Sequence, residues 1–149
     1  MSPCEILETA GTVLVIDWPS RDVPDTLVRA GFQVIVRGGP GPEDYSVWEL
    51  KDGKIVSRRA ARPPDRADLI YSHRPLGELA GINALARQLQ ATTIWMQSGR
   101  AAAGVNDPKG CWLPEDELRA ARSMVEAAGL RYVSEPYIGD VARSLSRPA

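Results

Sequence analysis

The chain has 149 residues, of which 44% are hydrophobic and 25% are charged, as expected for one folded domain of ordinary size. Its 18 Lys and Arg residues and its 19 Asp and Glu residues leave a net charge of -1, so the composition offers no basic field for nucleic acid. No apolar run is long enough to cross a bilayer and residues 1–10 lack the order of a signal peptide, so we expect a single cytoplasmic domain, residues 1–149, without a membrane partner.

The N-terminal part of the chain predicts a helix, a strand and a second helix. Residues 2–5 fit a capping box with proline at the first helical position, which predicts a short helix over Pro3–Thr9. The apolar run Thr12–Ile16 is typical of a strand that is buried on both faces. Apolar residues recur at helical spacing over residues 22–30, where we expect Asp22 to be the N-cap and Gly31 to follow the helix as a C-cap.

The next segment predicts a strand and a hairpin. Gln33–Arg37 contains an apolar run, and the glycines and prolines of residues 38–42 end it. Residues 46–50 and 54–57 flank Asp52-Gly53, a strong signal for a β-hairpin. Residues 58–66 carry four arginines, which favours a solvated connector, with a patch for an anionic ligand as the alternative.

The second half of the chain alternates strands with helices. Residues 67–71 predict a third parallel strand and residues 92–96 a fourth, and apolar positions at helical spacing predict a helix between them. Residues 114–128 predict another helix, which Gly129 closes, and residues 130–134 predict a fifth strand.

This order of elements predicts a parallel sheet with right-handed crossovers and helices on both faces. The expected fold class is α/β: a Rossmann-like three-layer α/β/α domain with a mainly parallel five-stranded sheet and an appended β-hairpin. Ligands bind to such sheets beyond the carboxyl ends of the strands. The candidate ligand-binding residues therefore follow the first four predicted strands of the parallel sheet: Asp17, Trp18, Pro19, Ser20, Arg37, Gly38, Gly39, Ser72, His73, Arg74, Pro75, Gln97, Ser98 and Gly99.

Several of these residues have more than one interpretation. Asp17 can cap the following turn, orient Ser20 or act as a ligand-binding carboxylate. Arg37 and Arg74 end two of the predicted strands, where a guanidinium can pair with a phosphate or with Asp17. The amide of Gln97 can both donate and accept hydrogen bonds to a ligand.

His73 is the only histidine, and its place at the carboxyl end of a strand makes it a candidate general acid or base. A hydrogen-bonded loop side chain or a ring that contacts a ligand is the stronger interpretation, because no nucleophile lies at a recognisable spacing. Cys4 and Cys111 lack the spacing of a zinc site or a disulfide framework, so we expect plain thiols and no metal. No catalytic residue is assigned.

Three motifs carry a resemblance to a known family. Trp95-Met96-Gln97-Ser98-Gly99 ends the predicted fourth strand, Asp68-Leu69-Ile70-Tyr71 leads the third strand into Arg74-Pro75, and Glu126-Ala127-Ala128-Gly129-Leu130 precedes the last strand. Over most of residues 12–136 the chain resembles the small stand-alone bacterial CoA-binding proteins, which are related to the CoA-binding domain of succinyl-CoA synthetase α subunits. The resemblance implies non-catalytic binding of CoA, acyl-CoA or a related adenine nucleotide, with the phosphates near the first βα turn and the adenine near the loop after the second strand.

The first βα turn differs from the family pattern. Where the family usually has Gly-x-Ser, this chain has Asp17-Trp18-Pro19-Ser20. A second hypothesis is therefore a regulatory protein-interaction module that has lost nucleotide binding and uses residues 45–57 and 100–113 as contact surfaces. A third is an enzyme that uses His73 and Asp17 as acid and base. The exposed edge of the predicted hairpin also allows pairing across a two-fold axis into a homodimer.

Overall fold

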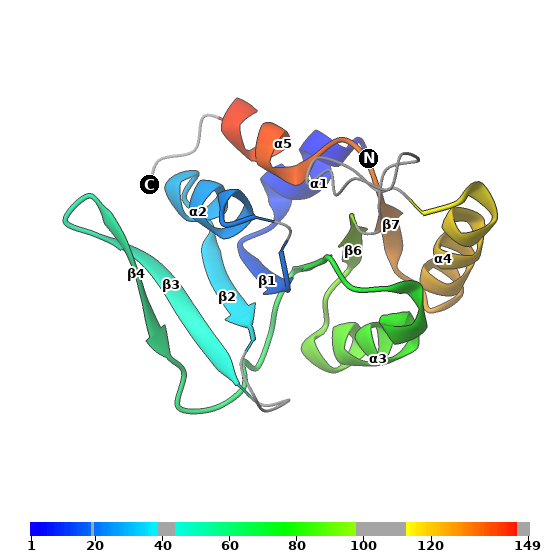
Figure 1. The fold of residues 1–149 in the computed structure, drawn as a ribbon, viewed down its shortest axis with the longest axis horizontal. Coiled ribbons are helices and arrows are strands. Elements are labelled where there is room, and N and C mark those ends of the chain that lie inside the picture. Colours follow the sequence, from blue (N-terminus) through cyan, green and yellow to red (C-terminus); the bar gives the residue numbers. More distant parts are fainter. Residues whose placement is uncertain (19, 39–43, 98–112, 146–149) are drawn as a thin grey trace.

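The structure, a computed structural model, describes residues 1–18, 20–38, 44–97 and 113–145, which form one sheet with helices on both of its faces (Figure 1). The strands, in chain order, are β1 (Thr12–Ile16), β2 (Gln33–Arg37), β3 (Tyr45–Lys51), β4 (Lys54–Arg59), β5 (Leu69–Ser72), β6 (Thr93–Met96) and β7 (Arg131–Val133). Each predicted strand is present, with ends that differ from the expected ones by a few residues at most. The α/β class is therefore confirmed.

The arrangement of the strands corrects one part of the predicted fold. Within the described residues the sheet has seven strands, in the order β4-β3-β2-β1-β5-β6-β7. β1 pairs in parallel with β2 and with β5, and the parallel pairing continues through β6 to β7, whereas β2 with β3 and β3 with β4 are antiparallel. The expected mainly parallel five-stranded sheet with an appended hairpin is thus wrong in its strand number and orientation, because β3 pairs with the backbone groups along the edge of β2 and the hairpin becomes part of one mixed sheet.

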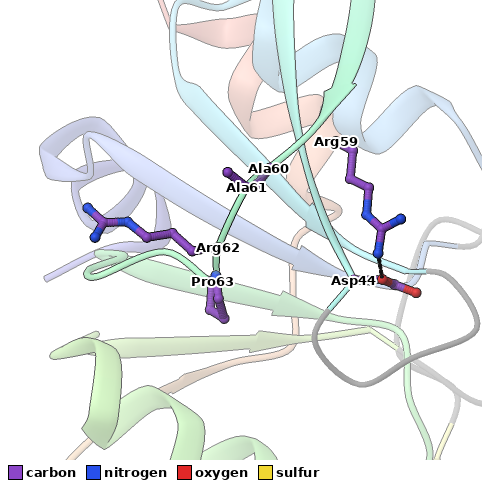
Figure 2. A pocket seen from close by; sticks show the side chains of 6 residues that line it. All are labelled: Asp44, Arg59, Ala60, Ala61, Arg62 and Pro63. Atoms are coloured by element: carbon purple, nitrogen blue, oxygen red, sulfur yellow. Dashed lines mark hydrogen bonds and ion pairs between the residues drawn. The ribbon is translucent and has the colours of Figure 1, made fainter.

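The hairpin itself forms at the predicted turn. Asp52 and Gly53 have φ angles of 53° and 76°, the two positive values that a type I′ turn requires and that glycine adopts without strain. β4 then continues to Arg59, so the first two arginines of the expected solvated connector belong to a strand. Figure 2 shows that the Arg59 guanidinium reaches back to Asp44, whose Oδ1 accepts a 2.8 Å hydrogen bond from Nη2.

The described helices are α1 (Pro3–Thr9), α2 (Asp22–Arg29), the 3₁₀ helix η1 (Leu76–Glu78), α3 (Leu79–Leu89), α4 (Glu115–Ala127) and α5 (Ile138–Ser144). α1, α2 and α5 cover one face of the sheet, and α3 and α4 cover the other (Figure 1). α1 has the predicted capping box, whereas α5 was not among the predicted elements. Of the helices in these ranges, none has both the length and the apolar character needed to cross a lipid bilayer.

The predicted N-cap of the second helix is a further correction. Arg21 occupies that position, but its side chain makes no capping hydrogen bond, and Asp22 lies in the first turn of α2. The Asp22 carboxylate instead accepts hydrogen bonds from Thr26 and from two residues near the C-terminus, Tyr137 and Arg143. Long-range partners have therefore replaced local capping at this residue.

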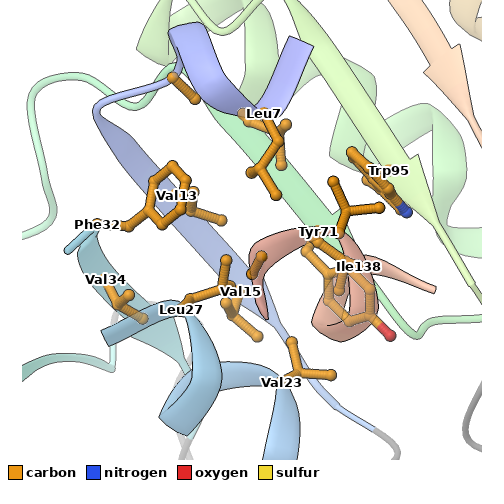
Figure 3. Close-up of a cluster of buried hydrophobic side chains, with 14 of the residues drawn as sticks. Leu7, Val13, Val15, Val23, Leu27, Phe32, Val34, Tyr71, Trp95 and Ile138 are labelled. Atoms are coloured by element: carbon orange, nitrogen blue, oxygen red, sulfur yellow. The ribbon is translucent and has the colours of Figure 1, made fainter. Parts of the chain in front are cut away.

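Two apolar clusters lie on the two faces of the sheet and hold these layers together. Val13 and Val15 of β1 face the first cluster, and Leu14 and Ile16 face the second, because side chains alternate along a strand. Figure 3 shows the first cluster, in which α1, α2 and α5 contribute Leu7, Val23, Leu27 and Ile138. Burial of each large side chain stabilises the fold by roughly 1.5 to 3 kcal/mol. Because β1 packs against both clusters, they fix its position in the sheet and so the position of its carboxyl end.

Candidate functional site

The site lies at the carboxyl ends of β1 and β5. The loops that follow these two neighbouring strands lead to opposite faces of the sheet. β1 leads toward α2 on one face of the sheet, and β5 leads through η1 to α3 on the other (Figure 1). The two strands remain hydrogen-bonded to the end, because His73 N donates to Ile16 O at 3.2 Å. In open α/β sheets ligands bind where loops diverge in this way, and the space between the β1 and β5 loops is called the crevice below.

An ion pair crosses this crevice from one loop to the other. Asp17 has a positive φ of 59°, and its Oδ1 accepts a 2.9 Å hydrogen bond from Trp18 N. Its Oδ2 accepts a 3.0 Å hydrogen bond from Arg74 Nη1. The sequence left two partners open for Arg74, a phosphate or Asp17. In the structure Arg74 pairs with Asp17. The side chains of Arg74 and Asp17 are 39% and 44% exposed, so a ligand can reach both.

Arg74 has a second carboxylate partner on its own side of the crevice. Its Nη2 donates to Glu78 Oε2 at 2.6 Å, and its Nε donates to the same carboxylate at 3.0 and 3.2 Å. The hydrogen bonds to Glu78, followed by those to Asp17, raise the pKa of the Arg74 guanidinium above its ordinary value. The guanidinium is therefore a permanent cation that two carboxylates hold at the mouth of the crevice.

His73 is oriented by the neighbouring strand. Its Nδ1 lies 2.6 Å from the carbonyl oxygen of Gln97. Because a carbonyl oxygen only accepts hydrogen bonds, Nδ1 carries a proton and donates it, and in the tautomer with that proton alone Nε2 is an acceptor. Asp17 is held by Arg74 and by its own turn, so the described contacts do not join His73 and Asp17 into the acid and base pair of the enzyme hypothesis.

The other candidate residues on these two edges have structural contacts. Ser72 is buried, and its Oγ accepts a 3.1 Å hydrogen bond from Arg74 N. Pro75 is the N-cap residue of η1. On the far side of β1, Arg37 ends β2 beside Ile16, and Gly38 N donates to Asp44 O at 3.0 Å. Arg37 and Arg74 therefore flank the end of β1 from its two neighbouring strands.

Gln97 is close to this site in the chain, but its side chain points into the protein. It is 0% exposed. Its Nε2 donates to the carbonyl oxygens of Ser134 and Pro136 at 3.2 and 3.1 Å, and its Oε1 accepts from Ile138 N at 3.1 Å. The amide thus satisfies three backbone groups between β7 and α5, which is a structural role that the sequence did not indicate.

The turn between β1 and α2 also contacts other parts of the protein. Trp18 packs edge-to-face against Trp48 of β3, with the ring centroids 5.7 Å apart, and the Arg21 guanidinium lies 4.9 Å from the centre of the Trp48 ring. Ser20 hydrogen-bonds the hydroxyl of Tyr137. Trp18 therefore has an aromatic partner on β3.

Beneath this turn lies a polar cluster that sequence reasoning missed. Tyr137 Oη donates a 2.7 Å hydrogen bond to Asp22 Oδ2, and Arg143 Nη1 donates to both oxygens of the same carboxylate at 3.0 and 3.1 Å. Burial acts to raise the pKa of Asp22, but the hydrogen bonds from Tyr137, Arg143 and Thr26 outweigh it and lower that pKa below 3.8. The partners lie 115 and 121 residues along the chain from Asp22, so no local spacing signals them.

The cluster predicts a specific loss of stability at alkaline pH. Burial, and then the hydrogen bond to Asp22, raise the pKa of the Tyr137 hydroxyl above its ordinary value of 10.0. A raised pKa in the folded state stabilises the protein fully below the unfolded pKa, and this contribution is lost as the pH rises through the folded pKa. We expect the wild type to lose up to about 1.4 kcal/mol per pH unit above pH 10 through this group alone.

The Tyr137→Phe variant isolates that contribution. At neutral pH the variant loses about 1 kcal/mol with the hydrogen bond, and above pH 10 the difference between the two proteins should shrink. Urea unfolding midpoints, measured at neutral pH and at several pH values above 10.0, give both differences. A difference that stays constant across this range would contradict the prediction.

Four of the candidate residues, Pro19, Gly39, Ser98 and Gly99, lie outside the described residues, as do Cys111 and most of the 100–113 loop. In the part of the chain that is described, no group of three or more His, Cys, Asp or Glu side chains is placed to share a metal ion. Comparison of the chain with models of protein families, with curated proteins and with solved structures gave no match.

Proposed function

We propose that the chain binds CoA, acyl-CoA or a related adenine nucleotide at the carboxyl ends of β1 and β5, without a chemical step. The observation that carries the proposal is the Arg74 guanidinium, partly exposed at the point where the β1 and β5 loops diverge. A planar guanidinium donates two parallel hydrogen bonds to a phosphate, which makes arginine the usual residue for such recognition. As part of the same proposal, we relate the chain to the Rossmann-like CoA-binding proteins. Arg74-Pro75 then corresponds to the turn that follows the third strand in that family.

The phosphates are assigned to Arg74 and not to the start of α2. A helix N-terminus attracts anions through its free N–H groups and its dipole. In this chain the first turn of α2 contains Asp22 and Asp25, and the hydrogen bonds to Asp22 keep its carboxyl charged. These carboxylates, already paired with Arg143 and Arg21, occupy the place where a phosphate would bind the helix, so we place the phosphate on Arg74 across the crevice.

The remaining groups of the crevice fit the rest of a nucleotide. His73 presents Nε2 as a hydrogen-bond acceptor for a ribose hydroxyl or an adenine amino group. The phosphate must compete with Glu78 and Asp17 for the Arg74 donors. The pair with Glu78 is bidentate and therefore stronger than a single surface ion pair, so only a phosphate with more than one negative charge is expected to displace it.

Calorimetric titration of the protein with CoA, and with ADP and NAD for comparison, tests the proposal. We expect Arg74→Gln to weaken CoA binding by about 10- to 100-fold, the loss of one or two charge-assisted hydrogen bonds. Glu78→Gln removes a competing carboxylate and should strengthen binding several-fold, an effect that a purely structural ion pair would not produce. Arg87→Gln, on the exposed side of α3, is the matched control and should bind as the wild type does.

Two results would contradict this proposal. One is the absence of heat and of thermal stabilisation with CoA and ADP, since a ligand that binds the folded state must raise its melting temperature. The other is CoA binding that Arg74→Gln leaves unchanged although the variant is folded, which would place the phosphates elsewhere.

A further inference from the structure

The strand at one end of the sheet, β4, has one side of its backbone unpaired by any described residue. Among the described strands β4 pairs with β3 alone, and the register places Glu49 opposite Val56 and Lys51 opposite Lys54. Ala60 N donates to Tyr45 O at 2.8 Å, which marks the hydrogen-bonded positions of this antiparallel pair. Because hydrogen-bonded pairs recur at every second residue, the backbone groups of even-numbered residues face β3.

The odd-numbered residues of β4 therefore point their backbone groups away from the sheet. Ile55, Ser57 and Arg59 present N–H and C=O groups in the spacing that an additional strand requires. An open row of this kind is the template for strand addition by another chain. β4 is the last strand at the left of the sheet in Figure 1, and β3 and β2 lie between it and β1.

The charge along this edge is of one sign. β4 has the sequence Lys-Ile-Val-Ser-Arg-Arg, with three cations and no acidic residue, in a chain whose net charge is -1. Arg58 pairs with Glu49 and Arg59 with Asp44, but the two arginine side chains remain 65% and 82% exposed. Carboxylates of a partner strand can therefore reach the guanidinium groups without breaking either pair.

A hollow of about 530 Å³ continues the basic edge beyond the last residue of β4. It is lined by Asp44, Arg59, Arg62, Pro63 and the two alanines between them. Figure 2 shows Arg59 directed toward Asp44 and Arg62 directed the other way, so guanidinium groups lie on both sides of the segment that leaves β4. An added strand that runs along β4 would reach this hollow at one end.

The hairpin also exposes two large apolar side chains. Val56 of β4 is 41% exposed and Leu50 of β3 is 40% exposed. Side chains alternate along a strand, so Lys54, Val56 and Arg58 share one face of β4 and Ile55 and Ser57 lie on the other. A partner strand with acidic and β-branched residues in alternation would place its carboxylates beside Lys54 and Arg58.

We propose that the edge of β4 binds an extended acidic segment of another protein, which adds to the sheet as an eighth strand. A second copy of this chain is disfavoured, because antiparallel pairing of β4 with itself about a two-fold axis at Val56 places Lys54 of each copy opposite Arg58 of the other. Like charges in adjacent positions destabilise a strand pair. The edge is independent of Arg74, so this inference does not rest on the proposed nucleotide binding.

A synthetic peptide of alternating Glu and Val residues, as long as β4, is the probe, and the matching Lys and Val peptide is the charge control. We expect saturable binding of the acidic peptide, weakened by salt because exposed charges are screened. Amide hydrogen exchange at Ile55, Ser57 and Arg59 should slow by about tenfold or more, while Val56 and Arg58, already bonded to β3, should change little.

Ser57→Pro tests the backbone contact directly. It removes an N–H that points outward and leaves the β3 ladder intact, as proline does on edge strands. We expect Ser57→Pro to abolish peptide binding and Ser57→Ala to preserve it. The inference is overturned by the absence of binding, by equal binding of the Lys and Val peptide, or by binding that leaves the outward amides unprotected. A concentration-dependent dimer that Ser57→Pro dissociates would also overturn it, because β4 would then pair with a second copy.

Discussion

Replacing Gln97 with alanine is expected to lower the free energy of unfolding by about 3 to 5 kcal/mol. The side chain is fully buried, and the substitution leaves the Ile138 N–H and the Ser134 and Pro136 carbonyls without the amide that binds them. The Pro136 carbonyl keeps only the 3.2 Å hydrogen bond from Trp95 Nε1. Urea unfolding, followed by circular dichroism, measures the change.

Two variants separate the hydrogen bonds from the volume. Gln97→Met fills most of the same space without an amide, so we expect it to recover the cavity cost and still to lose about 2 to 3 kcal/mol. Gln88→Ala removes the same type of side chain from an exposed position on α3 and should change stability by less than about 0.5 kcal/mol. If Gln97→Ala were as stable as Gln88→Ala, the amide would not hold α5 against β6.

Gln97 variants are poor probes of nucleotide binding. A Gln97 variant that lost CoA binding would be ambiguous, because partial unfolding of the segment between β7 and α5 would produce the same loss. The Arg74 side chain is exposed at the crevice and its removal buries no unpaired group. Arg74→Gln is for this reason the sharper variant, and the Gln97 series measures the framework beneath it.

The strands and most helices could be predicted because their signals are local. Thr12–Ile16 is apolar at every buried position and is covered on both faces, and Asp52-Gly53 has the two residue types that a type I′ turn needs. The sequence could not place the hairpin within the sheet, because the pairing of β3 with β2 depends on which edge is open after the parallel strands have assembled. Propensity specifies a strand, whereas the neighbour of that strand is a tertiary choice.

Some features of the candidate site could likewise be predicted from the sequence, and others could not. The positions of Asp17, His73 and Arg74 follow from the rule that polar residues at the carboxyl ends of parallel strands meet at one edge. The burial of Gln97 and the removal of Asp22 from its expected cap depend on α5, a short helix that sequence periodicity did not reveal. The partners of Asp22, Tyr137 and Arg143, lie more than a hundred residues from it in the chain, so only folding brings them together.

Gly139 gives the second large effect, and its importance is equally invisible in the sequence. A Cβ atom at this position would lie 2.5 Å from Cε2 of Tyr137 and 2.9 Å from Oδ2 of Asp22. Tyr137 is buried, so its ring has little room to move away. We expect Gly139→Ala to destabilise the protein by about 2 to 3 kcal/mol, the cost of overpacking a filled site.

Gly81→Ala is the matched control, because it makes the same substitution in α3 at a position where the new Cβ would meet no atom within 4 Å. Alanine favours a helix over glycine, so this variant should gain about 0.5 to 1 kcal/mol. A double-mutant cycle then identifies the cause: with Tyr137→Leu in place, Gly139→Ala should cost at least about 1 kcal/mol less than in the wild type. Equal effects of the two alanine substitutions would show that the Tyr137 ring moves aside freely. The contact of Tyr137 with Asp22, which joins α5 to α2 beside the β1 turn, would then be loose enough to leave Ser20 available to a ligand.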